Sequence, residues 1–314
     1  MLTIFAIPKA FKGMFENIQI NAVTSWLELD PKPQVILLGD DEGTADVAAR
    51  LGIEHVNNVD RNSYGTPLMP SIFRQGQALA RYPTVAYVNS DIILLSDFMS
   101  AVKTLTSEYG TSAFLGVGRK TVIPITELLD YRDPAWESKL RRRAAVEGEH
   151  VTYDSDFFVF PKGLYAKIPD FAIGRCYWSS WIMFDARRRR IPMVDLTRAV
   201  LTVEPKHDYS HAKSTGGASR LSGVEFRMNK AHFKGCRYYT TVNASRLLTP
   251  EGFAPAPASH HLLSFWVRSL YWVYFFLKGT SYPYSIPLIY IARWARAIGL
   301  RIASLQKQVQ KRAA

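Results

Sequence analysis

The chain has 314 residues, of which 47% are hydrophobic and 13% aromatic, so it is long and apolar enough to bury a globular core. Its two cysteines, Cys176 and Cys236, are too few for a disulfide framework and have no metal-binding spacing, which excludes the disulfide-rich secreted class and favours a cytoplasmic protein. The formal net charge of +12 favours an anionic partner: a nucleotide, a nucleic acid or a membrane surface.

The amino-terminal residues 1–8 have no basic leader, long apolar core or small-residue cleavage site, so we expect a strand there and not a signal peptide. A loop at 8–13 precedes a predicted helix at 16–29, whose apolar residues recur at three- and four-residue spacing. The alternation continues with a strand at 35–38, a helix at 44–51, a strand at 53–56 and a helix at 71–81. This series predicts an α/β fold with a mostly parallel central sheet flanked by helices on both faces.

The next predicted strand, at 85–88, leads directly into Asn89, Ser90 and Asp91. In open α/β sheets, ligands bind just outside the carboxyl ends of the strands, so a carboxylate here is well placed for chemistry. The alternative is that Asn89 and Asp91 only close the strand as turn residues.

Beyond Asp91 the pattern is less regular. We expect a helix at 97–109, a strand at 113–117, a charged segment at 123–146, a strand at 157–160 preceded by Asp154 and Asp156, a helix running into Arg187–Arg190, and a strand at 192–195. A polar stretch that contains His207 and His211 follows.

The last part of the chain differs in composition, because no acidic residue follows Glu251 while basic and aromatic residues accumulate. We therefore expect two domains, 1–250 and a helical extension at 251–314. Within the extension, residues 289–305 place apolar side chains on one helical face and arginines on the other, which is typical of a helix lying in a membrane interface. This predicts a cytoplasmic protein, peripheral on the inner face of an anionic membrane. The alternative is a helical hairpin that packs back on the first domain.

Six short segments, in this order, resemble the A-type glycosyltransferases of the nucleotide-diphospho-sugar transferase superfamily over roughly residues 1–215. They are Ile7-Pro8-Lys9, Gly39-Asp40-Asp41-Glu42-Gly43, Tyr64-Gly65-Thr66-Pro67, Asn89-Ser90-Asp91, Asp154-Ser155-Asp156 and His207-Asp208-Tyr209-Ser210-His211. The resemblance implies transfer of a sugar from a nucleotide-diphosphate donor, with a UDP-sugar favoured, to a saccharide or lipid-linked acceptor.

The resemblance also implies roles for individual residues. The nucleotide-sugar would be bound by Pro8, Lys9, Asp40, Gly65, Thr66 and Asn89, and a Mn²⁺ or Mg²⁺ ion by Asp91, with His207 or His211 as a further ligand. Asn89 stands where the family's Asp-x-Asp motif has its first aspartate, and an amide is a poorer ligand for a hard cation than a carboxylate. We therefore expect Asp91 to carry the metal and Asn89 to contact the ribose at most.

Sugar transfer that inverts the anomeric centre needs a carboxylate to deprotonate the acceptor hydroxyl. Asp156 is the first choice for this base, and Asp154 is the second catalytic candidate. Several relatives carry an acidic residue between two tryptophans, at a position where this chain has Ser179 and Ser180. Either the base lies elsewhere, the reaction is retaining, or transferase activity is lost.

The sequence also bears on three other functions. A sugar-1-phosphate nucleotidylyltransferase would need a Gly-rich, Arg-bearing triphosphate loop after the first strand, and residues 7–13 do not form one. A nucleic-acid binder is not favoured, because the basic residues accompany no recognised reading module. A catalytically degenerate transferase that serves as a scaffold at the membrane is the alternative supported by Asn89 and by the two serines.

Overall fold

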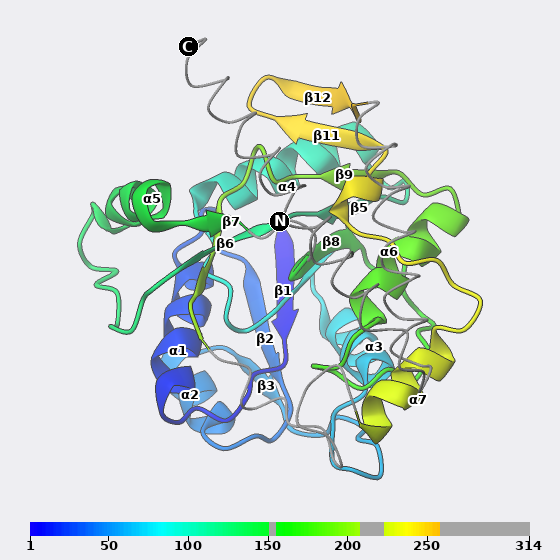
Figure 1. Cartoon of the computed structure of the whole chain (residues 1–314). Coiled ribbons are helices and arrows are strands. Elements are labelled where there is room, and N and C mark those ends of the chain that lie inside the picture. Colours follow the sequence, from blue (N-terminus) through cyan, green and yellow to red (C-terminus); the bar gives the residue numbers. More distant parts are fainter. Residues whose placement is uncertain (151–154, 208–222, 258–314) are drawn as a thin grey trace, which may run out of the picture. The chain divides into compact units, whose positions relative to one another are not determined.

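The computed structural model describes residues 1–150, 155–207 and 223–257. Its centre is a nine-stranded sheet with the strand order β12-β11-β9-β5-β8-β4-β1-β2-β3 (Figure 1). These strands are β1 (Leu2–Ala6), β2 (Gln34–Leu38), β3 (Glu54–Val56), β4 (Thr84–Val88), β5 (Leu115–Val117), β8 (Phe157–Pro161), β9 (Met193–Asp195), β11 (Arg246–Thr249) and β12 (Gly252–Pro255).

Within this sheet β8 and β12 run against the other strands, and all other pairings are parallel. The strand β1 pairs in parallel with both β2 and β4, so the chain extends the sheet first to one side of β1 and then to the other. The predicted fold class is confirmed: a mostly parallel sheet flanked by helices, as the resemblance to nucleotide-diphospho-sugar transferases implies.

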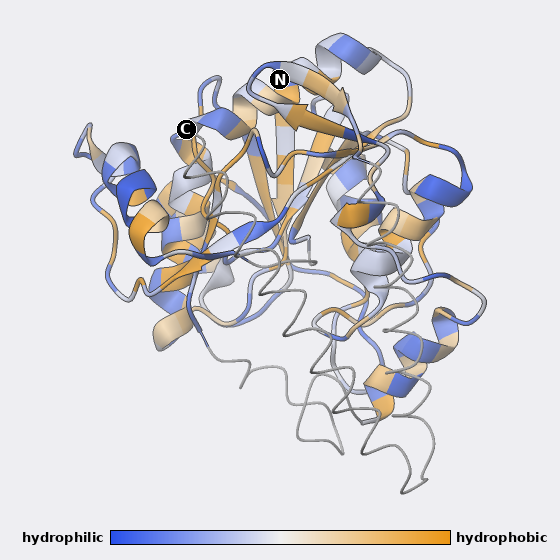
Figure 2. Cartoon of the chain, turned by 45° about the horizontal axis from the view of Figure 1, so that its top comes forward, coloured by the Kyte–Doolittle hydropathy of each residue, from blue (hydrophilic) through white to orange (hydrophobic). Residues whose placement is uncertain are grey.

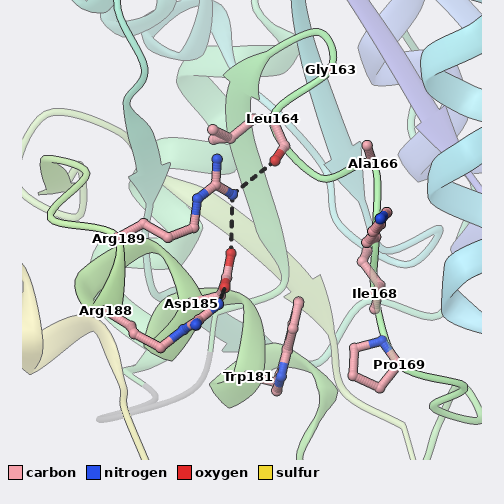
Figure 3. A pocket seen from close by; sticks show the side chains of 10 residues that line it. Gly163, Leu164, Ala166, Ile168, Pro169, Trp181, Asp185, Arg188 and Arg189 are labelled. Atoms are coloured by element: carbon pink, nitrogen blue, oxygen red, sulfur yellow. Dashed lines mark hydrogen bonds and ion pairs between the residues drawn. The ribbon is translucent and has the colours of Figure 1, made fainter.

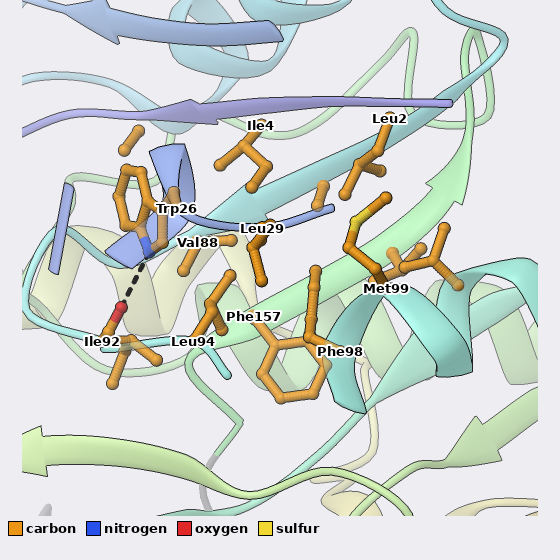
Figure 4. Close-up of a cluster of buried hydrophobic side chains, with 14 of the residues drawn as sticks. Leu2, Ile4, Trp26, Leu29, Val88, Ile92, Leu94, Phe98, Met99 and Phe157 are labelled. Atoms are coloured by element: carbon orange, nitrogen blue, oxygen red, sulfur yellow. Dashed lines mark hydrogen bonds between the residues drawn. The ribbon is translucent and has the colours of Figure 1, made fainter. Parts of the chain in front are cut away.

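Seven α-helices of the described chain surround the sheets. They are α1 (Met14–Leu27), α2 (Thr44–Leu51), α3 (Met69–Leu79), α4 (Ser96–Tyr109), α5 (Trp136–Glu147), α6 (Trp178–Arg188) and α7 (Val224–His232). Helices α1, α2 and α4 share one apolar core with the side chains that alternate strand residues present on that face, as period-two geometry requires. Figure 4 shows Leu2 and Ile4 of β1 facing Trp26 of α1 and Phe98 and Met99 of α4.

The opposite face is packed with aromatic rings. Phe5 of β1 and Tyr87 of β4 contact Phe73 of α3, and the Phe73 ring stacks on that of Phe160 from β8 at a centroid distance of 5.6 Å. In α3, Gly76 lies against the Phe5 ring, where a Cβ atom would clash. Figure 2 shows that the central strands are predominantly hydrophobic, whereas the surrounding helices combine hydrophobic and hydrophilic segments.

A second sheet of three strands, in the order β10-β6-β7, consists of β10 (Thr202–Pro205), β6 (Lys120–Ile123) and β7 (Glu149–His150). A small apolar core joins it to α5 and to Ile93 and Leu95, which follow β4. The sequence pattern predicts neither β6 nor β10, because these strands are short and their pairing partners are distant in the chain. This sheet brings the residues after β10 toward the end of β4.

The hairpin formed by β11 and β12 spans residue 250, so the large sheet continues past the expected domain boundary. The expected amphipathic extension from residue 258 onward lies outside the described residues. Among the residues that the structure describes, no helix is both long and apolar enough to cross a membrane.

Candidate active site

The site is built where β1 and β4 lie side by side and the chain switches from one half of the sheet to the other. Ligands of open α/β sheets bind at the carboxyl ends of the strands at such a switch point. The loop after β1 carries Lys9, and the segment after β4 carries Asp91. The Lys9 ammonium nitrogen Nζ lies 2.8 Å from Asp91 Oδ2, so the structure brings these two predicted site residues together.

Both segments are held by Gln19, a fully buried residue of α1. The Lys9 N–H donates to Gln19 Oε1 at 2.7 Å, and Gln19 Nε2 donates to the Lys9 carbonyl at 2.9 Å. The Ser90 hydroxyl also donates to Gln19 Oε1, at 2.9 Å. One amide therefore fixes the backbone of the β1 loop relative to the end of β4.

The three-stranded sheet β10-β6-β7 places two more side chains that can bind a metal ion, Glu204 and His207, beside Asp91. Ile93 exchanges backbone hydrogen bonds with Val203 of β10, at 2.8 and 3.1 Å. Next to Val203 is Glu204, and after β10 comes His207, whose side chain is 2% exposed. His207 Nε2 lies 3.4 Å from Asp91 Oδ2 and 3.3 Å from Glu204 Oε1.

Asp156 reaches the same edge because β8 is antiparallel to β4, so the residue before β8 lies opposite the residue after β4. The Asn89 N–H donates to the Asp156 carbonyl at 2.9 Å, and Asn89 Nδ2 donates to Asp156 Oδ1 at 2.8 Å. Lys120, the first residue of β6 and 7% exposed, places its Nζ 3.0 Å from Asp156 Oδ2 and 2.8 Å from Glu204 Oε2. Lys120 thus links Asp156, the predicted base, to Glu204, which lies beside Asp91 and His207.

The cluster combines the carboxylates of Asp91, Asp156 and Glu204 with the ammonium groups of Lys9 and Lys120. Burial of the Asp91 carboxyl raises its pKa, but the charge of Lys9, the hydrogen bond from His207 and the charge of Lys120 together outweigh burial. The pKa of Asp91 is therefore held well below its ordinary value. Asp91 is ionised across the physiological range.

Two observations indicate that the cluster around Asp91 could hold a divalent cation. One carboxylate oxygen of Asp91, Oδ1, is buried and has no hydrogen-bond partner among the described residues. Potential ligand atoms of Asp91, Glu204 and His207 lie within 4.8 Å of one another. Carboxylate oxygens are the donors that hard divalent cations prefer, so these three side chains would hold the ion.

The residues predicted for the nucleotide form a second group around Arg61. The Arg61 guanidinium pairs with both Asp40 and Asp41 after β2 and lowers the pKa of Asp40, chiefly through a hydrogen bond. It also donates to the Gly65 carbonyl at 2.8 Å, while Asn62 Oδ1 accepts from the Thr66 N–H at 3.0 Å. The Gly65 turn has φ of +79°, which favours glycine.

The loop after β1, with buried Pro8, is joined to the loop after β2 by a 2.8 Å hydrogen bond from the Phe11 N–H to the Glu42 carbonyl. The Asp40 group and the Lys9 group therefore occupy neighbouring loops at the carboxyl edge of the sheet. Asp154 and His211 lie outside the described residues.

The sequence pattern did not predict Glu204, Lys120 or Gln19 as site residues. Glu204 could have been found from its position three residues before His207. Lys120 and Gln19 carry no local signal, because each gains its role from segments distant in the chain. The Ser180 hydroxyl, in the tryptophan-flanked position, is engaged by the Tyr239 backbone on both sides, at 2.7 and 2.8 Å.

A separate cavity of about 610 Å³ lies between α6 and the loop after β8 (Figure 3). Asp185 Oδ2 there accepts from Arg189 Nη1 at 3.1 Å, and the same nitrogen donates to the Leu164 carbonyl at 2.9 Å. Because β8 ends opposite the first residue of β4, this cavity is at the amino-terminal edge of the parallel strands, away from Asp91. Of the predicted site residues that the structure describes, none lines this cavity.

Comparison with solved structures gives distant matches. S. aureus TarS 1-349 in complex with UDP-GlcNAc has 12% identity and a TM-score of 0.47, over 75% of this chain and 67% of that chain. Glucosyl-3-phosphoglycerate synthase from Mycobacterium tuberculosis, in complex with Mg²⁺ and UDP, has 15% identity and a TM-score of 0.42, over 74% and 78%. HddC from Yersinia pseudotuberculosis has 10% identity and a TM-score of 0.37, over 65% and 93%.

In another match, to TarS 1-349 with UDP, this chain spans 36% of that chain. No family model matches the chain, and no curated protein matches it. TM-scores below 0.5 mean that the backbones superpose only in part. What those proteins bind therefore does not transfer to this chain by likeness, and its chemistry follows from its own residues.

Proposed function

We propose that the protein is a glycosyltransferase that moves a sugar from a nucleotide-diphosphate donor, by preference a UDP-sugar, to a saccharide or lipid-linked acceptor. The observation that carries this proposal is the meeting of Lys9, Asp91, Glu204 and His207 at the switch point between β1 and β4. An ammonium group beside a buried carboxylate and imidazole group suits a diphosphate and its counter-ion.

The donor would lie along the carboxyl edge of β2, β1 and β4. Asp40 and Pro8 would border the base and ribose, and the Gly65–Thr66 turn, which Arg61 links to Asp40, would close this part of the site. Asn89 donates one of its two amide hydrogens to Asp156, so its carbonyl oxygen and its second N–H would be the groups offered to a ribose hydroxyl. Lys9 would bind the diphosphate as a charge-assisted donor.

Asp91, Glu204 and His207 would hold Mn²⁺ or Mg²⁺ at the diphosphate. When bound, the ion neutralises the negative charge that builds on the leaving diphosphate. Lys120 holds Glu204 in place from the other side through its 2.8 Å contact with Oε2.

Asp156 is the proposed base, with Asp154 as the second candidate. Asp156 Oδ1 accepts from Asn89 and Asp156 Oδ2 lies 3.0 Å from Lys120, so the carboxylate that would accept the proton of the acceptor hydroxyl is held in position. Ser180 is unsuited to this role because its hydroxyl serves the backbone of Tyr239.

Calorimetry with UDP and Mn²⁺, together with hydrolysis of a panel of sugar nucleotides, tests the proposal. We expect the wild type to bind UDP in the presence of Mn²⁺ and to hydrolyse one donor, Asp91→Ala to lose Mn²⁺-dependent binding, and Asp156→Asn to bind but not turn over. Asp60→Asn is the control, since Asp60 is 61% exposed and paired with Arg74. Binding that is indifferent to Asp91→Ala contradicts the metal site.

The alternative function is a catalytically degenerate transferase fold that acts as a scaffold at the membrane. It is supported by Asn89 in place of the first carboxylate and by the serines at 179 and 180. It predicts UDP binding without hydrolysis of any donor in the panel and without any effect of Asp156→Asn.

We also propose that the basic, aromatic segment after Glu251 docks the protein on an anionic inner leaflet. The support is compositional: basic and aromatic residues without a single carboxylate, with apolar and arginine faces over 289–305. Full-length protein should float with anionic liposomes at low salt, and protein ending at Pro257 should not. Equal flotation of the two forms would show that this segment is not the anchor.

A further inference from the structure

The Lys9 ammonium pairs with an oxygen atom that also belongs to the proposed metal site, Asp91 Oδ2. Lys9 Nζ lies 2.8 Å from Asp91 Oδ2, and the same oxygen lies 3.4 Å from His207 Nε2. A divalent cation held between Asp91 and His207 would therefore have the positive charge of Lys9 as its neighbour while Lys9 pairs with Asp91. At such short range, repulsion between like charges in a partly buried site is large.

The site is also nearly neutral without a metal ion. Three carboxylates (Asp91, Asp156, Glu204) face two ammonium groups (Lys9, Lys120), which leaves about one negative charge when His207 is neutral. A buried carboxylate left without a counter-charge would be strongly destabilising, and here lysines supply that charge. The free protein thus has little electrostatic need for a divalent ion.

The two lysines differ in their freedom to move. Lys120 is 7% exposed and held between two carboxylates. The Lys9 side chain is 28% exposed and its Nζ lies 4.7 Å from the centroid of the Phe15 ring, while its backbone is fixed by Gln19. Its ammonium can therefore turn toward a ligand at the carboxyl ends of the strands without any change in its backbone.

We propose that Lys9 is a built-in counter-cation: it neutralises Asp91 in the free protein and transfers to the diphosphate when the donor arrives, which frees Asp91 for the divalent ion. Nucleotide diphosphate and metal ion then bind with positive cooperativity, and each favours the other by the same factor. This inference rests on the proposed function, because it assumes that the site takes a nucleotide diphosphate.

The experiment measures Mn²⁺ affinity of the full-length protein, by electron paramagnetic resonance of free Mn²⁺, with and without saturating UDP. The variants are Lys9→Met, which removes the charge, Lys9→Arg, which keeps it, and Lys12→Met. Lys12 is the matched control because it lies in the same loop, is 72% exposed and pairs with Glu42.

We expect the wild type to bind Mn²⁺ weakly alone and about 10- to 100-fold more tightly with UDP, which is a typical range for coupling between two sites. Lys9→Met should bind Mn²⁺ about tenfold or more tightly without UDP, with a smaller gain when UDP is added. Lys12→Met should behave like the wild type, and Lys9→Arg, which keeps the positive charge, should retain the weak Mn²⁺ affinity of the wild type in the absence of UDP.

Two results overturn the inference while leaving the proposed function intact: wild-type UDP and Mn²⁺ binding without cooperativity, or an unchanged Mn²⁺ affinity in Lys9→Met. A wild type that binds neither UDP nor Mn²⁺ overturns the proposed function itself. Because Lys9 is partly exposed, its variants should fold, and matching thermal unfolding curves check this before titration.

Discussion

Replacement of Lys120 by methionine tests whether the charge network at the site holds the small sheet in place. The substitution keeps the side-chain volume and removes the charge between Asp156 Oδ2 and Glu204 Oε2, at 3.0 and 2.8 Å. Both carboxylates are largely buried, at 14% and 6% exposure, so solvent can compensate only in part.

The expected loss follows from burial. Removing one partner of a buried ion pair costs roughly 3–5 kcal/mol, because the other charge stays buried without compensation. Asp156 keeps its 2.8 Å hydrogen bond from Asn89, and Glu204 keeps His207 at 3.3 Å. We therefore expect the free energy of unfolding to fall by about 3 kcal/mol, at the lower end of that range.

Urea denaturation in metal-free buffer at neutral pH measures the loss. The matched control is Lys206→Met, since Lys206 pairs with Glu149 at 3.2 Å while both side chains are more than half exposed. Exposed pairs contribute little, so this control should lose about 0.5 kcal/mol or less. The double variant Lys120→Met/Glu204→Gln should regain part of the loss, because it removes one stranded carboxylate.

A loss below about 1 kcal/mol for Lys120→Met, equal to that of the exposed control, would refute the buried network as a source of stability. Strict additivity in the double variant would equally contradict a direct Lys120–Glu204 interaction.

Three further predictions concern stability. Gln19→Leu should lower the free energy of unfolding by about 3 kcal/mol and weaken UDP binding, because it leaves buried backbone and hydroxyl groups unpaired; an unchanged melting temperature would contradict this. The pKa of Asp91 is lowered in the folded state, so the ionised carboxylate contributes its full share to the free energy of unfolding above about pH 4, and this share is lost as the pH falls further. The difference in the free energy of unfolding between the wild type and Asp91→Asn should therefore narrow in acid titrations below about pH 4. Gly76→Ala should lower the melting temperature despite the better helix propensity of alanine, because its Cβ would meet the Phe5 ring; a rise would show that the ring yields.

Local residue patterns are sufficient to predict the first half of the fold and the strand-end carboxylate Asp91 at its switch point. Buried strands appear as continuous apolar runs and helices as three- and four-residue spacing, and both signals are local. The segments predicted at 35–38, 44–51 and 85–88 correspond to β2, α2 and β4 within one residue. Because ligands of open α/β sheets bind at the carboxyl ends of the strands, Asp91 is expected at this edge, whereas the family resemblance implies Lys9 beside the nucleotide; the two side chains form an ion pair.

The other groups that surround Asp91 come from contacts between distant segments, which local residue patterns do not show. Glu204 and Lys120 reach it through the pairing of β10 with β6 and through the Ile93–Val203 bridge, which join segments far apart in the chain. Strands of four residues carry too little periodicity to predict such pairings, and Ile123 of β6 and Val203 of β10 meet Leu140 of α5 in one apolar cluster only in the folded chain.

The same distinction applies to charge and hydrogen bonding. The sequence shows that Lys9, Lys120 and Gln19 exist, but not that one amide holds two loops or that two ammonium groups pair with three carboxylates. The free energy of a buried charge depends on its distance from other charges and from solvent, and folding alone sets both. The strand-end motif was therefore predictable from local pattern, whereas its electrostatic balance arises from contacts between distant segments.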